Sequence, residues 1–219
     1  MVLIMKDIKS AEERKFEIIV AASELFAAKG YDHTSINDIL EKVGIAKGTL
    51  YYHYKSKEEI LDALIEYYGT NAIKIANQIA ADKSLPVVER IVKIIVSINI
   101  NVSDNSAGKE VIEQIQRPQN ALMRQKSKKF TIKEMLPIIT KVLTEGIEQG
   151  IFNTEYLTES VEMILVYVSN VFDDNITDLT ETELMKRAIA FIYNMERLLG
   201  AETGGLRLMT QIFDKGRGA

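Results

Sequence analysis

The segment from Lys47 to Tyr54 gathers side chains that can form hydrogen bonds and flat apolar contacts. It reads Lys-Gly-Thr-Leu-Tyr-Tyr-His-Tyr, in which only Leu50 is a clear apolar anchor. Ammonium and hydroxyl groups can bond to the acceptors on base edges and phosphates, and an aromatic ring can cover an apolar group. The three tyrosines cannot all face one side of a helix, so we expect at least one to be exposed. These features favour a recognition surface over a buried helix.

Catalytic chemistry is poorly supported by the residues available. The chain has no cysteine, which excludes disulfides, thiolate catalysis and cysteine-based zinc sites, and His33 and His53 are its two histidines. We find no Gly-x-Ser-x-Gly, no Walker A loop and no histidine pair at metal-ligand spacing. The pair Asp173-Asp174 falls at an expected helix end, where solvated carboxylates are ordinary. We therefore expect a protein that is not an enzyme and needs neither a cofactor nor a metal.

The amino-acid composition limits which classes of protein this chain can belong to. The chain is 47% apolar with three prolines, which predicts a substantial core, and its formal net charge of -4 argues against indiscriminate coating of nucleic acid. The apolar start, Met1 to Met5, is too short for a signal peptide. The run from Ile94 to Ile100 falls far short of the ~20 residues that a membrane span needs. A cytoplasmic protein without a membrane partner is expected.

The elements around the Lys47–Tyr54 segment are predicted to be helices with tight turns. A capping box at Ser10-Ala-Glu-Glu13 begins a helix that Gly30 ends, and a short helix capped by Thr34 or Ser35 ends at Gly44. A second capping box, Ser56-Lys-Glu-Glu59, begins a helix of about 25 residues, or roughly 37 Å. Two short helices, a short exposed third and a long fourth form the arrangement of a helix-turn-helix domain.

The rest of the chain keeps the same helical periodicity. Further helices are predicted at about 86–103, 108–128, 132–149, 156–174 and 181–201, and residues 206–213 can also form a helix. No segment alternates convincingly enough for a strand. The predicted class is all-α, with about nine main helices.

Residues 12–68 resemble the DNA-binding domain of the TetR (tetracycline repressor) family. The matching stretches are Ala22–Tyr31, Thr34–Ile39 and Val43–Leu61, in order and almost without gaps. Leu40 departs from the family, which usually has a small residue there, so we expect slightly altered packing between the first two helices. The resemblance implies a helix-turn-helix domain over residues 1–57. It also implies that a long helix joins this to a helical effector-binding and dimerisation domain over residues 58–219.

The resemblance also implies which residues contact double-stranded operator DNA. Lys47 and Thr49 would face base edges, and Tyr52 would make an apolar or phosphate contact. The full expected set is Thr34, Ser35, Lys47, Gly48, Thr49, Tyr51, Tyr52, His53 and Lys57. Among these, Thr34, Tyr51, His53 and Lys57 are expected at phosphates. Lys42, Lys47, Lys55 and Lys57 would supply positive charge on this face of an acidic protein.

Two later helices are expected to make a homodimer. The segment 156–174 is apolar nearly all round, so it must be buried on more than one side, and 181–201 offers a matching apolar face. Two such helices from each subunit would form a four-helix interface about a two-fold axis, as the resemblance also implies. A monomer with an ordinary buried helix is the alternative.

Polar residues inside apolar runs indicate a small-molecule pocket. The candidates are Asn99, Gln116, Arg117, Asn120, Met123, Tyr167 and Asn170. Gln116–Asn120 and Gly146–Phe152 also resemble segments of some TetR-like C-terminal domains. The resemblance implies a repressor that binds palindromic operator DNA as a dimer and that an unknown small molecule releases. The alternative is a DNA-binding protein of the same fold that a protein partner controls, without a small-molecule effector.

Overall fold

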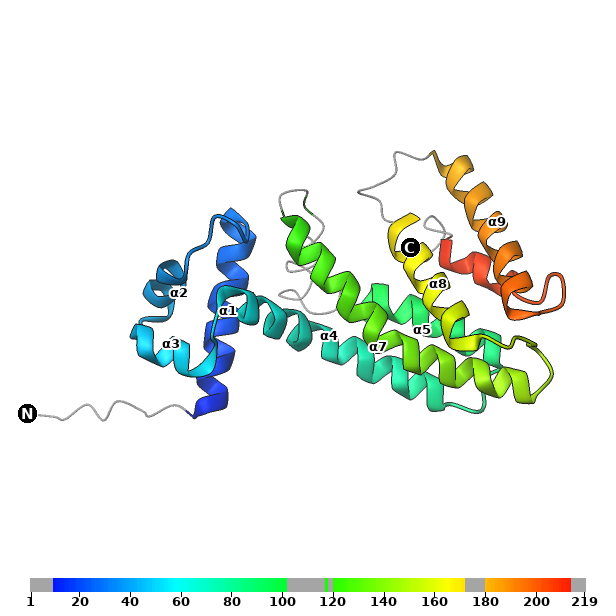
Figure 1. Ribbon diagram of the computed structural model, residues 1–219, viewed down its shortest axis with the longest axis horizontal. Helices are drawn as coiled ribbons and strands as arrows, with labels where there is room; N and C mark the ends of the chain where they lie inside the picture. Colours follow the sequence, from blue (N-terminus) through cyan, green and yellow to red (C-terminus); the bar gives the residue numbers. More distant parts are fainter. Residues whose placement is uncertain (1–9, 102–116, 118–119, 172–179, 214–219) are drawn as a thin grey trace, which may run out of the picture. The chain divides into compact units, whose positions relative to one another are not determined.

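The computed structural model describes residues 10–101, 117, 120–171 and 180–213, without the side chains of residues 98–101 (Figure 1). Every regular element in these ranges is helical, which confirms the all-α class. The elements are α1 (Ala11–Lys29), α2 (Ile36–Val43), α3 (Lys47–His53), α4 (Lys57–Ala81), α5 (Val87–Asn101), α7 (Ala121–Glu148), α8 (Leu157–Val171), α9 (Glu181–Leu199) and the 3-10 helix η2 (Arg207–Phe213). These nine elements of the described ranges agree with the number expected.

The chain divides into two compact units. The first comprises Met1–Tyr67 and Glu110–Lys126, and the second comprises Tyr68–Lys109 and Ser127–Ala219. Both α4 and α7 therefore have residues in each unit. This division differs from the limits 1–57 and 58–219 expected from the sequence, because the start of α7 packs with the first unit. As limits of functional domains, the expected ranges stay a prediction.

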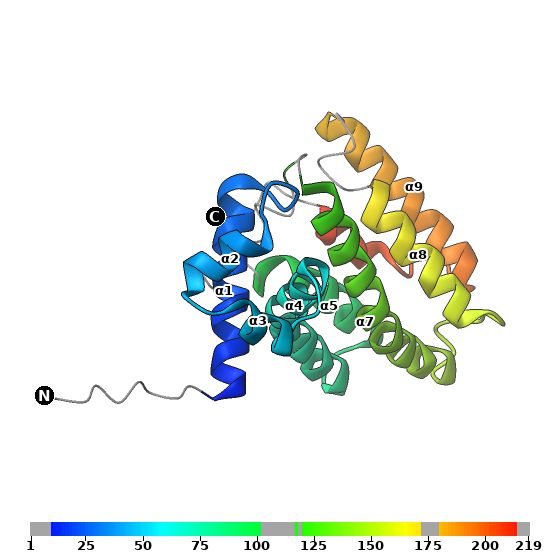
Figure 2. The same ribbon diagram turned by 60° about the vertical axis from the view of Figure 1, so that its left-hand side comes forward.

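The core of the first unit lies between α1 and the two short helices that follow it. α1 buries Ile18, Ala22 and Phe26, four residues apart, and in both views α2 and α3 lie beside it (Figures 1 and 2). The capping box at its start is confirmed: Glu13 N–H donates to Ser10 Oγ (3.2 Å), and Ser10 N–H donates to the Glu13 carboxylate (2.7 Å). The spacing that predicted this helix thus also predicts the face that it buries.

The second unit has its own apolar core. Buried side chains come from α4, α5, α7, α8, α9 and η2, among them Ala76, Ile94, Val142, Val161, Leu199 and Phe213. α8 and α9 lie side by side in both views. None of the helices in the described ranges is long and apolar enough to cross a membrane.

The prediction of separate helices over 108–128 and 132–149 was wrong for the part that the structure describes. Residues 121–148 form one continuous helix, and Pro137 lies inside it with its side chain exposed. The expected gap at 129–131 contains Lys, Phe and Thr, none of which breaks a helix. Phe130 lies against Gly69 of α4, where a β-carbon would overlap the ring, so the helix is also held by packing. Residues 108–116 lie outside the described residues.

Candidate nucleic-acid interface

α3 is a short helix with one buried side and a broad exposed side. Leu50 is fully buried, and Tyr54, which ends the helix, is only 5% exposed. Burial raises the pKa of the Tyr54 phenol to about 12, so this hydroxyl stays protonated at neutral pH. Leu50 and Tyr54 hold α3 against the first unit, and the rest of the helix stays accessible.

The exposed side of α3 combines a cation, a hydroxyl and two aromatic rings. Lys47 and Thr49 are exposed, and the Lys47 ammonium lies 5.8 Å from the centre of the Tyr51 ring. Tyr52 is 75% exposed, and its ring meets His53 edge-on at 5.0 Å. A β-carbon built at Gly48 meets no atom within 4 Å, so the backbone there is open to a partner. Hydrogen-bond donors, acceptors and flat apolar surface therefore lie together on one short helix.

Two ion pairs hold α2 against α1. Lys29 pairs with Asp38 at 2.8 Å, and Lys42 pairs with Glu24 at 2.6 Å. The Lys29 ammonium, followed by the Ser35 hydroxyl and N–H, holds the pKa of the Asp38 carboxyl well below its usual range. Because α3 follows α2 after a tight turn, these contacts help to fix the direction in which α3 faces.

The α2–α3 turn depends on a left-handed residue. Gly44 has φ +72° and ψ 38°, which glycine adopts without the cost that a β-carbon imposes. The carbonyl of Leu40 accepts the N–H groups of both Gly44 (2.9 Å) and Ile45 (3.2 Å). Leu40 itself is half-buried. Only three residues, 44–46, therefore separate the end of α2 from the start of α3.

Three expected DNA-contact residues use their polar groups inside the domain. Thr34 is 1% exposed and its hydroxyl donates to the Gly30 carbonyl at 2.8 Å, and its expected contact with phosphate stays a prediction. The Ser35 hydroxyl and N–H engage Asp38 as the N-terminal cap of α2. Half-buried Lys57 donates to the carbonyls of Tyr31 (2.7 Å) and Thr34 (2.8 Å), so two of its three protons are used within the unit.

The other lysines expected on this face also make local contacts. Lys42 forms the ion pair with Glu24, and Lys55 donates to the Tyr51 carbonyl at 2.9 Å, near the end of α3. Half-buried His53 lies against Tyr52. The exposed side chains of α3 are those of Lys47, Thr49, Tyr51 and Tyr52. The sequence alone could not show which of these polar side chains bond within the domain and which stay exposed, because several of the partners are backbone carbonyls.

The structure does not place the seven candidate effector residues in one unit. Asn120 and Met123 are each 1% exposed in the first unit, which also contains the exposed Arg117. Tyr167 and Asn170 lie exposed on α8 in the second unit. The side chain of Asn99 and all of Gln116 lie outside the described residues. The Asn120 side chain accepts the N–H of Tyr31 at 3.1 Å, which gives it a partner within the protein.

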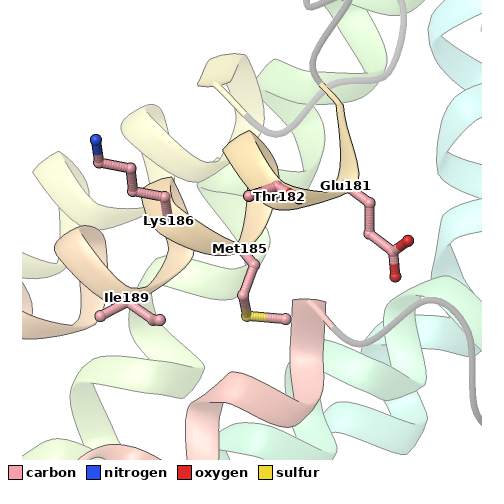
Figure 3. A pocket seen from close by; sticks show the side chains of 5 residues that line it. All are labelled: Glu181, Thr182, Met185, Lys186 and Ile189. Atoms are coloured by element: carbon pink, nitrogen blue, oxygen red, sulfur yellow. The ribbon is translucent and has the colours of Figure 1, made fainter.

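A hollow of about 490 Å³ lies at the first turns of α9, away from the candidate effector residues in the sequence. It is lined by Glu181, Thr182, Met185, Lys186 and Ile189, none of which was expected from the sequence. In Figure 3 the Met185 and Glu181 side chains point to one side of the helix and Lys186 points away. Among the residues that the structure describes, no group of three His, Asp or Glu side chains could hold a metal ion.

Comparison with family models gives two matches. Residues 18–64 match the model described as bacterial regulatory proteins, tetR family, and residues 102–193 match the tetracyclin repressor-like C-terminal domain. The first match contains α2 and α3 entire and most of the buried side of α1. The exposed side of α3 therefore lies in the segment that the first model covers.

Individual relatives agree with these matches. A fatty acid metabolism regulator protein of Bacillus subtilis (strain 168) is 27% identical over 143 residues, or 65% of this chain and 72% of that protein. The biofilm operon icaADBC HTH-type negative transcriptional regulator IcaR of Staphylococcus epidermidis is 50% identical over 52 residues, or 24% of this chain and 28% of that protein. The second likeness therefore concerns a minor part of both chains.

Solved structures show the same fold. The crystal structure of RolR in complex with the ligand resorcinol superposes with a TM-score of 0.59 at 17% identity, covering 95% of this chain and 96% of that one. At this identity the likeness concerns the fold alone.

Proposed function

This chain belongs to the tetR family of bacterial regulatory proteins, and from that premise we propose that it is a transcriptional repressor. It binds palindromic operator DNA as a homodimer, and a small-molecule effector releases it. The observation that carries this proposal is the exposed side of α3, whose polar and aromatic groups have no core to pack against. Negative regulation is supported by the 50% identity, over 52 residues, to a negative transcriptional regulator.

In this proposal α3 enters the major groove, which is ~12 Å wide and admits a helix. Lys47 and Thr49 reach the base edges, because they are exposed and carry a donor and a hydroxyl. Tyr52 supplies apolar or phosphate contact, Tyr51 and His53 face phosphates, and Gly48 lets the backbone approach. Thr34, Ser35 and Lys57 act mainly by holding the α1–α2 loop, since their polar groups already have partners there.

The exposed apolar side chains of α8 and α9 support the homodimer. Met163 is 61% exposed and Val166 44% exposed on α8, while Ile189 and Tyr193 are more than half exposed on α9. All four lie on α8 and α9, which are side by side, and in this proposal they form one apolar face. Covering this face with a second copy removes apolar surface from water, which is the main driving force of most protein association. The dimer then presents two α3 helices to two half-sites about one DNA turn, ~34–36 Å, or more apart.

Effector binding is supported by the match of residues 102–193 to a tetracyclin repressor-like C-terminal domain. RolR, whose fold is similar, is a protein with a bound ligand, resorcinol. By linkage, an effector that weakens operator binding must itself bind more weakly, by the same factor, when operator is bound. An effector that acts in this way therefore binds the protein more weakly when operator is present. A protein that merely competes for the same DNA need not bind this chain at all.

A titration of the full chain against its own upstream DNA and a scrambled control tests the proposal. At ~150 mM salt, specific binding is expected to be ~10³-fold or more tighter than non-specific binding. The double variant Lys47→Ala/Tyr52→Ala should lose this preference, and Lys141→Ala, an exposed lysine on α7, should keep it. Equal affinity of the wild-type protein for every sequence, in the upstream DNA and in a random-sequence selection, would contradict the proposal.

A further inference from the structure

Tyr31, in the loop between α1 and α2, is held on several sides. Its N–H donates to the side-chain carbonyl of Asn120 at 3.1 Å, and its own carbonyl accepts the Lys57 ammonium at 2.7 Å. The same ammonium lies 4.1 Å from the centre of the Tyr31 ring, and Phe26 meets that ring edge-on at 5.1 Å. Tyr31 is 7% exposed and Asn120 1% exposed, so water does not compete freely for the bond between them.

Asn120 comes from a distant part of the chain. It lies 89 residues after Tyr31, directly before the first residue of α7. Met123, one turn later, is 1% exposed. Lys126 then pairs with two carboxylates of α4, Glu58 at 2.8 Å and Asp62 at 2.7 Å. The start of α7 is therefore attached to the first unit by a buried hydrogen bond, a buried side chain and an ion-paired lysine.

The bond from Asn120 matters because the loop after Tyr31 leads directly into α2. Thr34 closes the loop through its N–H to the Tyr31 carbonyl (3.2 Å) and its hydroxyl to Gly30, and Ser35 then caps α2. A shift of Tyr31 therefore shifts the N-terminal cap of α2, and with it the turn that leads to α3. A buried N–H that loses its acceptor is costly, so Asn120 favours one loop position strongly over others.

We propose that Asn120 is a positioning residue for DNA reading: through Tyr31 it sets the placement of α2 and α3. This inference rests on the proposed function. Residues 127–148 of α7 belong to the second unit, so a change there that displaces the start of the helix acts on the α1–α2 loop through Asn120. In this proposal Asn120 transmits a displacement of α7 to the α1–α2 loop. It does not itself contact the effector, unlike the role expected from the sequence.

Two variants separate the hydrogen bond from the packing of Asn120. Asn120→Leu keeps a similar volume and removes the acceptor, whereas Asn120→Asp keeps an oxygen that can accept the Tyr31 N–H. Asn77→Leu is the matched control, because Asn77 is exposed on α4 and its amide donates to the carbonyl of Ile73 within the same helix. Each variant is made in the full chain.

Amide hydrogen exchange over residues 31–54 gives a readout that does not depend on DNA. Asn120→Leu should speed exchange there about tenfold, as expected for loss of a buried hydrogen bond, while α8 and α9 keep their wild-type rates. Asn120→Asp should restore much of the protection, and Asn77→Leu should not alter it. Unchanged exchange over residues 31–54 in Asn120→Leu would overturn the inference.

If Asn120→Leu does not fold, Lys126→Met carries the test, because it removes the ion pairs at the start of α7 near the surface. It should speed exchange over residues 31–54 by a smaller factor, and no change would count against the inference. Operator affinity should fall about tenfold in Asn120→Leu and recover in Asn120→Asp. The two measurements can also disagree. If exchange changes as expected but the wild-type protein shows no sequence-specific DNA binding, Asn120 keeps its structural role and the proposed function is wrong.

Discussion

Leu50 and Tyr52 lie two residues apart on α3 and have opposite environments. Leu50 is fully buried and Tyr52 is 75% exposed. The sequence predicted this contrast, because one apolar residue among polar and aromatic ones can anchor only one side of a short helix. An exposed tyrosine of this kind has no role in the core of the described unit, so its exposure favours contact with a partner.

Gly48 provides a direct test at the residue scale. Because a β-carbon there meets no atom within 4 Å, Gly48→Ala should fold normally and gain up to about 1 kcal/mol of helix stability. The added methyl group would occupy space that the proposed DNA backbone or base edges need. We expect operator affinity to fall about tenfold while the melting temperature stays level or rises. Binding as tight as wild type would show that DNA approaches another part of α3.

Thr34, Lys57 and Asn120 mark the limit of sequence reasoning about single residues. The polar type of each was noted, but its partner was not. Thr34 bonds to the carbonyl of Gly30, four residues before it, whereas the partners of Lys57 and Asn120 are backbone groups brought near by folding. Asn120 meets the N–H of a residue 89 positions away, and no local spacing signals such a contact. Lys57 in turn bonds to two carbonyls more than 20 residues before it. Residue type alone does not separate contacts inside a domain from contacts with a ligand.

At the scale of elements, capping patterns predicted helix starts well. Thr180–Glu183 forms the reciprocal bonds of a capping box, as Ser10–Glu13 does. At Ser56 only half of the expected box forms: Glu59 N–H donates to Ser56 Oγ (3.0 Å), but the Glu59 carboxylate accepts from Lys55 N–H. Such motifs are local, so spacing in the sequence is enough to find them. The continuity of α7 was missed, since α7 is also held by the contact of Phe130 with Gly69 of another helix.

The contact between α1 and α2 should depend on pH through Asp38. The pKa of this carboxyl is lowered in the folded protein, first by the Lys29 ammonium and then by Ser35. Its stabilising effect is therefore present above the unfolded pKa, ~3.9, and is lost as the pH falls below that value toward the folded pKa. Urea unfolding of wild type and Asp38→Asn from pH 7 to pH 3 measures this effect.

The difference between the two proteins is the quantity to follow, because other carboxylates with lowered pKa, such as Glu145 and Glu183, titrate in both. Wild type should be the more stable at pH 7, and the difference should shrink as the pH approaches 3. A difference that stays constant over this range would mean that the carboxylate of Asp38 contributes nothing through its charge.

Arg90 joins three helices of the second unit and should be its most sensitive charged residue. Its guanidinium, 2% exposed, donates to the Ala80 carbonyl at the end of α4 (2.9 Å) and to Glu145 of α7 (2.7 Å). Arg90→Met keeps an apolar stem but leaves both acceptors without this partner, which should cost about 3 kcal/mol in unfolding free energy. Lys83 pairs with the same carboxylate but is 60% exposed, so Lys83→Met should cost less than about 1 kcal/mol. Equal losses in denaturant unfolding would refute this ranking.

At the scale of the whole molecule, the proposed homodimer explains why large apolar side chains of α8 and α9 are exposed in the single chain. Met163→Glu places a charge at a position that is 61% exposed in one chain, so folding of the single chain should tolerate it. In the dimer the same charge would be buried and unpaired, which opposes association. We expect sedimentation to change from about twice 24.7 kDa to 24.7 kDa, with weaker operator binding. The control is Asn77→Glu on α4, and an unchanged dimer in Met163→Glu would place the interface elsewhere.

The sequence predicted the all-α class and the helix-turn-helix arrangement, because periodicity and caps are local signals. The effector site that it indicated stays a prediction. Its seven candidates were chosen as polar residues within apolar runs, but the described ones belong to two different units. Polar groups such as that of Asn120 proved to have partners inside the protein, which is the commoner fate of a buried polar side chain.

The measurement that tests the central claim most directly is a titration of wild type and Lys47→Ala against the operator and all its single-base variants. If α3 reads base edges, Lys47→Ala should weaken operator binding by about 1–3 kcal/mol and lose its preference at one base-pair position per half-site. Preferences at the other positions should remain. A uniform loss of affinity over every sequence, with all preferences intact, would contradict the account, because Lys47 would then contact only phosphates.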